Sequence, residues 1–193
     1  MNEPVLAWWH GLSVQWKQAF AETVFHHSNE PSPAELAQLH AAPALRFAGP
    51  QAPYPNMSFE LNDLSGIAAL TNLQILVIVF QQLESVAELQ ALTNLKSLFM
   101  YNNCIRSLNG IENLTALEQL YVQGNQVNSL RPIENLTRLK ELYVNDNRLS
   151  SLEGLTEEHA GALEIFFCKP NAGLKQKELL GIERELGIRC RGL

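Results

Sequence analysis

Cysteine is scarce in this chain of 193 residues, and the few cysteines form no recognisable motif. The three of them, Cys104, Cys168 and Cys190, are widely spaced and include no CxxC pair. An odd number at such spacings fits neither a zinc site nor a disulfide framework. We therefore predict three reduced thiols in a reducing compartment, with Cys104 and Cys168 packed in the core.

Long apolar runs are also lacking. The longest, residues 75–80, is far shorter than the roughly 18 residues that suggest a membrane-spanning helix. The beginning of the chain, MNEPVLAWWHGLSVQW, has no positively charged start, and its apolar stretch is interrupted by His10, Gly11 and Ser13. Such a segment is a poor signal peptide. We predict a cytoplasmic protein without a membrane segment.

Positive charge is sparse. The chain has 14 Lys and Arg against 20 Asp and Glu, a net charge of −6, and no basic run longer than a residue or two. Nucleic acids and anionic membranes both require clustered Lys and Arg. Neither is predicted as a partner.

Catalytic and cofactor motifs are missing as well. GxSxG, HExxH and phosphate-binding glycine loops do not occur. His26 and His27, with His10 and His40 nearby in sequence, fit no usual spacing of metal ligands. The sequence therefore predicts no enzyme, no cofactor and no metal site.

What the chain does contain is an internal repeat. The segment LEQLYVQGNQV, residues 117–127, recurs in modified form from Leu73, Leu95 and Leu139, and successive copies start 22 residues apart. A fifth copy starts two residues late, at Leu163. Each copy has a second half, best seen in IRSLNGIENLTA and VNSLRPIENLTR. One unit cannot bury its apolar side alone, so we predict stacked units that share a core.

The spacing within a unit assigns each position. Leu120 and Val122 lie two residues apart, so they point from a short strand into the core. An asparagine follows the strand, and its side chain can pair with backbone N–H and C=O groups that the turn buries. We predict a stacked asparagine ladder of Asn103, Asn125, Asn147 and Asn171, with Gln81 in place of asparagine in the first copy.

This is the leucine-rich-repeat pattern, LxxLxLxxNxL. The chain resembles the short 22-residue class found in bacterial internalins and in the regulatory subunit that binds type-1 protein phosphatase, over roughly residues 61–172. The resemblance implies an α/β solenoid, a right-handed superhelix with a parallel sheet on its concave side. The second halves are too short for full helices, so we expect 3₁₀ or single helical turns on the convex side, with Ile111 and Leu114 inward.

The N-terminal segment has the features of a helical cap that would cover the first unit. Apolar residues recur at helical spacing from Leu12 to Val24, behind a possible N-cap at Ser13. The capping-box sequence SPAE, residues 32–35, would open a second helix. A strand at residues 44–48 then leads the sheet, and GPQAPYPN has the composition of a surface loop.

The C-terminal segment would cover the other end. Apolar residues from Leu179 to Leu186 share one helical face, Gly187 is the expected C-cap, and a closing strand turns Ile188 and Cys190 inward. We expect one structural domain in three parts: a helical N-terminal cap with its connecting loop over residues 1–56, about five repeats over residues 57–172, and a C-terminal cap over residues 173–193.

The residues between the inward positions define the concave face. With Leu120 and Val122 inward, Tyr121 and its neighbours on either side point outward. Carried across five units, the central column is Val77, Phe99, Tyr121, Tyr143 and Phe167, flanked by Ile75, Ser97, Gln119, Glu141 and Ile165 on one side and by Val79, Tyr101, Gln123, Asn145 and Lys169 on the other.

The aromatic central column has three interpretations. The rings either stabilise the sheet through cross-strand pairs, form a binding stripe with polar surroundings, or are covered by another part of the chain. We favour the binding stripe. The first strand is apolar on both faces, so either the N-terminal cap or its loop covers Ile75, Val77 and Val79, or this end forms part of an interface. We favour the cover. The predicted partner-binding residues are Phe99, Tyr101, Gln119, Tyr121, Gln123, Glu141, Tyr143, Asn145, Phe167 and Lys169.

The leading functional hypothesis is a non-catalytic, monomeric, cytoplasmic bacterial protein that binds another protein on its concave face. A rigid array would present its rings with little ordering cost. The alternative is a binder of a small molecule or glycan in the same groove, and a third possibility is self-association through the same rings.

Overall fold

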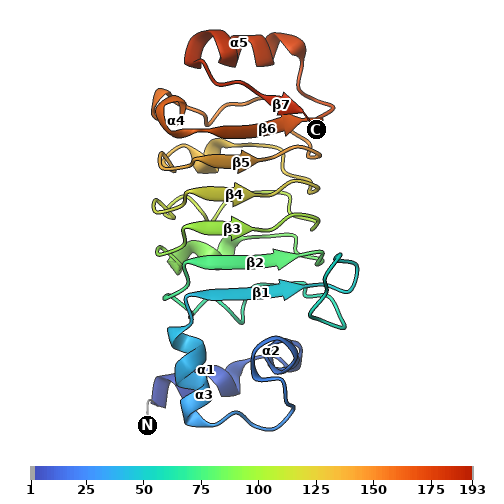
Figure 1. Ribbon diagram of the computed structural model, residues 1–193, viewed down its shortest axis with the longest axis vertical. Coiled ribbons are helices and arrows are strands. Elements are labelled where there is room, and N and C mark those ends of the chain that lie inside the picture. Colours follow the sequence, from blue (N-terminus) through green and yellow to red (C-terminus); the bar gives the residue numbers. More distant parts are fainter. Residues whose placement is uncertain (1–2, 193) are drawn as a thin grey trace.

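Short parallel strands, one for each turn of the chain, stack in sequence order into one open sheet in the computed structural model, which describes residues 3–192 (Figure 1). No strand is inserted between two that are consecutive in the chain, so the architecture is the predicted α/β solenoid. The seven strands are β1 (Ala44–Ala48), β2 (Ile75–Val79), β3 (Ser97–Phe99), β4 (Gln119–Tyr121), β5 (Glu141–Tyr143), β6 (Ile165–Lys169) and β7 (Arg191–Gly192).

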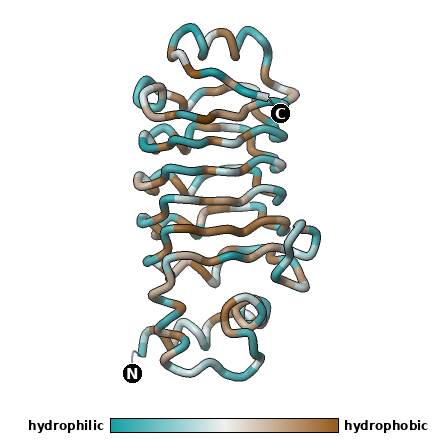
Figure 2. Tube along the Cα trace, in the orientation of Figure 1, coloured by the Kyte–Doolittle hydropathy of each residue, from teal (hydrophilic) through white to brown (hydrophobic). Residues whose placement is uncertain are grey.

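Equivalent residues of successive units pair in register. Leu98 faces Leu120, which faces Leu142 on the next strand, and these side chains are at most 1% exposed. Val122 is fully buried as well. Hydrophobic residues therefore recur in every turn of the solenoid (Figure 2). Burying each such side chain contributes roughly 1.5–3 kcal/mol. The predicted inward positions are confirmed.

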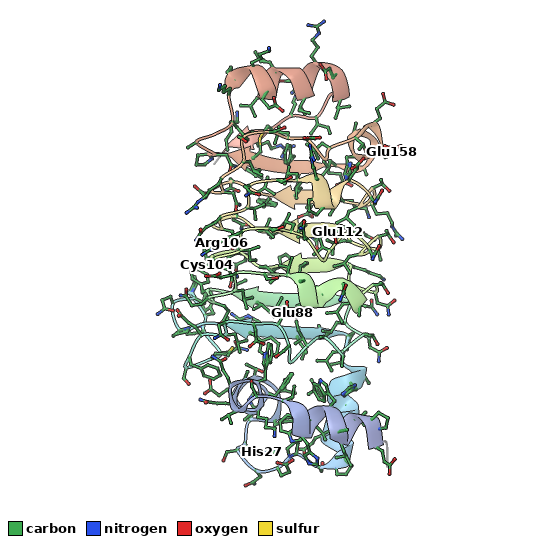
Figure 3. All side chains as sticks on the ribbon, turned by 180° about the vertical axis from the view of Figure 1, so that it is seen from behind. His27, Glu88, Cys104, Arg106, Glu112 and Glu158 are labelled. Atoms are coloured by element: carbon green, nitrogen blue, oxygen red, sulfur yellow. A yellow bond between two sulfur atoms is a disulfide. The ribbon has the colours of Figure 1, made fainter. Side chains whose placement is uncertain are left out.

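The convex side is built from short turns, as Figure 3 shows from behind. Two units carry 3₁₀ segments, η2 (Ala87–Ala91) and η3 (Arg131–Ile133), and the last full unit carries the short helix α4 (Glu157–Ala162). Ile111 and Leu114 are fully buried. The predicted 3₁₀ or single helical turns are confirmed.

A neutral histidine joins α4 to the preceding unit. The ring of His159 is fully buried. Its Nδ1 accepts a hydrogen bond from the Thr156 N–H at 3.1 Å, and its Nε2 lies 3.2 Å from the Ile133 carbonyl oxygen. Burial lowers the pKa of His159 below its ordinary value, although the Ile133 carbonyl acts in the opposite direction. Protonation of Nδ1 would remove the acceptor of the Thr156 N–H at the N-terminus of α4.

The asparagine ladder is present. Asn125 accepts from the Ile105 N–H at 3.0 Å and donates to the carbonyls of Met100 and Val122 at 2.9 and 3.0 Å. Asn147 repeats this pattern one unit later, with Val127 N–H as its donor. Each side chain therefore joins two units through backbone groups that water cannot reach.

Gln81 forms the first rung with its longer side chain. Its amide oxygen accepts from the Leu61 N–H at 2.6 Å, and its amide nitrogen lies 3.3 Å from the Phe47 carbonyl oxygen. Gln81 is 2% exposed. Glutamine in place of asparagine thus still accepts from one backbone N–H and donates to one backbone carbonyl.

From Glu3 onward, the N-terminal cap contains four helical segments. Ser13 caps α2 by accepting from the Trp16 N–H, and Ser32 and Glu35 form the predicted capping box of α3. The fully buried Trp16 donates from Nε1 to Asp63 at 2.9 Å, which ties the cap to the first unit. The segments are α1 (Glu3–Gly11), α2 (Val14–Phe20), the π-helical η1 (Ala21–Phe25) and α3 (Pro33–Ala41).

Two details of this cap differ from the prediction. The helix expected to run to Val24 is α-helical only to Phe20 and continues as the π turn η1. The first helix, α1, was not predicted from the sequence. It forms where its tryptophans meet the rest of the cap: the Trp8 ring lies 4.5 Å from the His40 ring, measured between centroids.

The loop after β1 closes the free edge of the sheet. The side chain of Asn56 accepts from the Ala48 N–H at 2.7 Å and donates to the Arg46 carbonyl at 2.8 Å. These are the groups with which a further strand would pair. An unpaired strand edge invites association with other chains, so this side chain shields the β1 edge.

The C-terminal cap consists of α5 (Gln176–Leu186) and the two-residue strand β7. Gly187 ends the helix with a φ of 69°, a left-handed conformation that suits glycine. Ile188 is buried, as expected, but the paired strand begins only at Arg191. The closing strand is therefore shorter and later than predicted.

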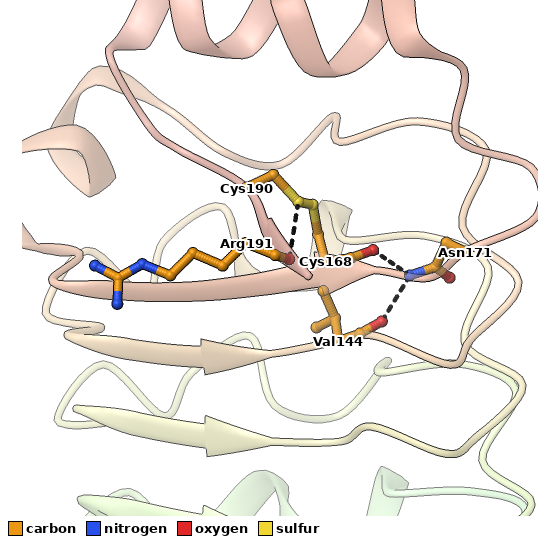
Figure 4. The surroundings of a disulfide bond; sticks show 5 residues. All are labelled: Val144, Cys168, Asn171, Cys190 and Arg191. Carbon is orange, nitrogen blue, oxygen red and sulfur yellow. Dashed lines mark hydrogen bonds between the residues drawn. A yellow bond between two sulfur atoms is a disulfide. The ribbon is translucent and has the colours of Figure 1, made fainter. Parts of the chain in front are cut away.

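The prediction of three reduced thiols is wrong. Cys168 on β6 and Cys190 before β7 form a disulfide (Figure 4). Their Cα atoms are 5.5 Å apart, within the usual range for such a bond. The cap brings together two residues 22 positions apart that no sequence motif connects. Cys104 is free.

No helix within residues 3–192 is long and apolar enough to cross a membrane.

Candidate binding face

The central column of the concave face is a continuous row of rings. Phe99, Tyr121, Tyr143 and Phe167 occupy paired positions on β3 to β6. Successive ring centroids are 4.8, 4.1 and 4.8 Å apart. All four side chains are partly exposed, whereas their chain neighbours Leu120 and Leu142 are buried. The rings share one face, as the pattern predicted.

Contact between the rings supports the sheet-stabilising interpretation. Parallel strands hold equivalent residues about 4.8 Å apart, which is close to the spacing of the centroids. Cross-strand aromatic pairs contribute roughly 0.2–1 kcal/mol each. All four residues nevertheless remain partly exposed. Stabilisation and binding therefore do not exclude each other, and contact with a partner stays a prediction.

Hydrogen bonds hold the polar side chains beside the rings. Ser97 donates to Gln119 at 2.7 Å, and Gln119 donates to Glu141 at 3.1 Å. The other Glu141 oxygen accepts from the Tyr121 hydroxyl. Burial, followed by this hydrogen bond, raises the pKa of Tyr121 well above its ordinary value. Tyr121 thus stays a protonated donor with a fixed ring orientation.

The column on the other side is less accessible than predicted. Asn145 was expected at the surface but is 1% exposed, and it donates to Asp146. Tyr101 packs edge-on against Phe80, with ring centroids 5.8 Å apart. Gln123 is partly exposed and Lys169 is exposed. Asn145 is therefore too deeply buried to contact a partner directly.

The connecting loop covers part of the first strand. Val79 is 2% exposed and packs with Ala48 and Ala52, so the loop covers this residue as expected. Val77 is partly exposed, whereas Ile75 is 42% exposed. The prediction is therefore correct for Val79 and wrong for Ile75. The apolar surface of the face extends from the ring row onto β2.

Two arginines extend the central column at its ends. Arg46 pairs with the Val77 position and Arg191 with the Phe167 position. Both side chains are exposed. The sequence predicted the strands that contain these two arginines. The outward columns, however, were assigned for the five repeat units only, so neither arginine was included in the predicted face.

A shallow groove runs along the beginning of the strands. It has a volume of about 370 Å³. Its lining residues are Gln74, Ile75, Lys96, Ser97, Glu118, Gln119, Lys140 and Glu141. The rings of Tyr121 and Tyr143 do not line it. Within residues 3–192, no cluster of His, Cys, Asp or Glu is arranged to hold a metal ion.

Stacked units, an asparagine ladder and an open sheet face define a leucine-rich-repeat solenoid. The family model described as leucine-rich repeats (2 copies) matches residues 93–135 and 115–157. The chain thus contains leucine-rich repeats over residues 93–157 and has the fold of bacterial leucine-rich-repeat proteins. No curated protein sequence matches it significantly.

Solved structures of bacterial leucine-rich-repeat proteins share this fold. An internalin (inlF) from Listeria monocytogenes is 24% identical, with a TM-score of 0.59 over 69% of this chain and 38% of its own. Internalin C2 (inlC2) from the same species is 25% identical, with a TM-score of 0.55 over 72% and 55%. A leucine-rich-repeat protein from Leptospira interrogans is 22% identical, with a TM-score of 0.64 over 84% and 40%. The chain spans about two fifths to just over half of these structures.

Proposed function

We propose that this protein is a non-catalytic module that binds a protein partner on its concave face. The observation that carries the proposal is the row of Phe99, Tyr121, Tyr143 and Phe167, which is continuous across four strands and partly exposed. Leucine-rich-repeat proteins typically mediate protein–protein interactions. Aromatic residues with polar surroundings are typical of the centre of such interfaces.

The rings are ordered before a partner arrives. Tyr121 is held between Phe99 and Tyr143 and donates to Glu141. A side chain that is immobilised on binding costs roughly 0.5–1.5 kcal/mol in lost conformational freedom. Because these rings already lack that freedom, most of the cost is absent, and the contact energy contributes to affinity.

Affinity capture from the native cell tests this proposal. We expect wild-type protein to retain a partner that the Tyr121→Ala/Tyr143→Ala variant loses, with a decrease in binding free energy of about 2 kcal/mol or more if either ring is a hot spot. The matched control, Tyr121→Phe/Tyr143→Phe, keeps both rings and should retain capture. Equal capture by the alanine variant would count against the concave face.

The proposal includes a cytoplasmic location, a monomeric state and the absence of nucleic-acid or membrane partners. The cytoplasmic location was predicted partly from reduced thiols, and the Cys168–Cys190 disulfide removes that reason. Disulfides persist mainly in oxidising compartments. Mass spectrometry of alkylated protein from the native cell measures the oxidation state of both cysteines, and a disulfide found there would argue against the cytoplasm.

A small molecule or glycan is the second candidate ligand. The groove of about 370 Å³ favours it, because the exposed polar side chains of Gln74 and Lys96 line it beside the exposed Ile75. A glycan array and a thermal-shift screen of small polar metabolites would test this candidate. Binding that survives Tyr121→Ala but is lost in Gln119→Ala would place such a ligand in the groove rather than on the rings.

A further inference from the structure

We propose that the partner segment that docks on the concave face is acidic: an extended polypeptide of about nine residues, with carboxylates near both ends and apolar side chains between them. The inference rests on the proposed function and names the chemistry of the partner. Four observations carry it: the charges at the ends of the ring row, the state of the acidic groups beside the rings, the overall charge of the chain and the length of the row.

The cations at the ends of the row are positioned and unpaired. The Arg46 guanidinium donates to the carbonyl of Tyr54, and that of Arg191 donates to the carbonyl of Glu164 at 3.3 Å. Figure 4 shows the Arg191 side chain running along β6. Within the described part of the chain, neither arginine forms an ion pair with a carboxylate. Both can therefore bind a partner's carboxylate, because the planar guanidinium can donate two parallel hydrogen bonds to it.

Two of the acidic groups beside the rings, Glu118 and Glu141, are already engaged. Both Glu141 oxygens accept hydrogen bonds, one from Tyr121 and one from Gln119. Glu118 pairs with Lys140 at 2.7 Å and with Arg138 at 3.3 Å. Because these carboxylates already accept hydrogen bonds from donors of the same chain, they would pair only weakly with a basic partner.

The sign of the face is opposite to that of the whole chain. Among the outward positions of the seven strands, the charged residues are three cations, Arg46, Lys169 and Arg191, and one anion, Glu141. The chain as a whole carries a net charge of −6. A cationic surface on an anionic protein favours an acidic ligand, and the remaining surface repels that ligand from other orientations.

The length of the row sets the length of the segment. Arg46 on β1 and Arg191 on β7 are six strand steps apart. At about 4.8 Å a step this is roughly 29 Å, the length of about nine residues of extended chain at about 3.3 Å each. Between the arginines the segment would lie over Val77 and the four rings, a surface suited to apolar side chains.

Selection from a displayed library of random twelve-residue peptides tests the inference. We expect peptides that bind wild type but not Tyr121→Ala to contain several-fold more Asp and Glu than Lys and Arg. In Arg46→Gln/Arg191→Gln the acidic bias should weaken, and in Arg46→Glu/Arg191→Glu it should disappear or reverse. The matched control, Lys177→Glu/Arg184→Glu, changes two exposed cations on α5 and should keep the bias.

The outcomes separate the two proposals. Peptides that depend on Tyr121 but show no acidic bias, or a basic one, would overturn the inference and leave the binding face intact. Failure to recover any peptide that depends on Tyr121 would count against the face itself and remove the inference with it. A selected acidic peptide should also bind at least tenfold more weakly at high salt than at low salt, measured by fluorescence anisotropy. Unchanged unfolding temperatures of the arginine variants would exclude misfolding as the cause of a lost bias.

Discussion

Adjacent residues on β4 give the sharpest test of the division between core and face. Leu120 is fully buried between Leu98 and Leu142, and its neighbour Tyr121 lies on the opposite side of the same strand. We compare Leu120→Ala with Tyr121→Ala. Because both changes fall on one strand, local backbone effects are similar, and the difference reports which side chain belongs to the core.

The expected magnitudes follow from the surroundings. Leu120→Ala leaves a closed cavity and should lower the free energy of unfolding by about 2–5 kcal/mol. For a chain of this size that corresponds to a decrease in Tm of roughly 4–20 °C, at about 2–4 °C per kcal/mol. Tyr121→Ala removes two ring pairs of roughly 0.2–1 kcal/mol each and one partly solvated hydrogen bond of about 0.5–1.5 kcal/mol, so we expect a loss of about 1–3.5 kcal/mol, smaller than that for Leu120→Ala.

Urea denaturation followed by far-UV circular dichroism measures both losses. The slope of the transition should be the same for all variants, since a changed slope would indicate a changed denatured state or loss of two-state unfolding. Tyr121→Phe serves as the control, because it keeps the ring and removes only the bond to Glu141. A loss for Tyr121→Ala as large as that for Leu120→Ala would refute the assignment of outward and inward positions.

Three further predictions concern the ladder, the disulfide and the buried histidine. Asn125→Ala should cost more than about 2 kcal/mol by denaturation, because buried backbone groups lose their partners at about 1–3 kcal/mol each, whereas Asn128→Ala at an exposed site should cost less than about 0.5 kcal/mol; similar losses would contradict the ladder. Reducing agent should lower the Tm of wild type, since opening a loop of 22 residues costs about 3 kcal/mol. Cys190→Ser should not respond to reductant, Cys104→Ser should respond as wild type does, and a wild-type Tm that ignores reductant would contradict the disulfide. Burial lowers the pKa of His159, so its contribution to stability is complete above the unfolded pKa of about 6.5 and is lost as the pH falls through the folded value. His159→Gln should therefore lose less stability than wild type between pH 7 and pH 5, and parallel curves would show that this histidine is not responsible.

The repeat made much of the fold predictable. A period of 22 residues places identical side chains in register, so one assignment of Leu120 and Asn125 applies to every unit. The inward positions, the rungs of the ladder and the shared face of the rings all follow from that single assignment. Outside the repeats no such redundancy exists, and there the predictions were less complete.

The missed features depend on contacts between distant parts of the chain. Helix α1 lacks a strong local signal, and it is held by rings such as Trp8 and Trp9 that pack against the rest of the cap. The Cys168–Cys190 bond depends on where the cap strand meets β6, which spacing alone does not reveal. The partial cover of β2 depends in the same way on the path of the loop that contains Ala52.

The turn after most of the strands carries a further periodic signal. The residue before the rungs Asn103, Asn125 and Asn147 has a left-handed backbone, with φ of 56° at Asn102, 68° at Gly124 and 53° at Asp146. Asparagine, glycine and aspartate are the residues that tolerate this conformation. Phe80 occupies the same position with a φ of 54°, and no local preference of phenylalanine predicts it. Its ring packs on Tyr101, beside the candidate face.

The ladder makes the molecule extendable from its middle. Asn125 and Asn147 use equivalent backbone groups in their own and the preceding unit, so a duplicated copy of the 22 residues that begin at Leu117 would find every partner it needs. Neither terminal cap would have to change. Each added unit would lengthen the ring row by one tyrosine and about 4.8 Å. A series of proteins with different numbers of units would therefore measure the length of the segment that binds to the row.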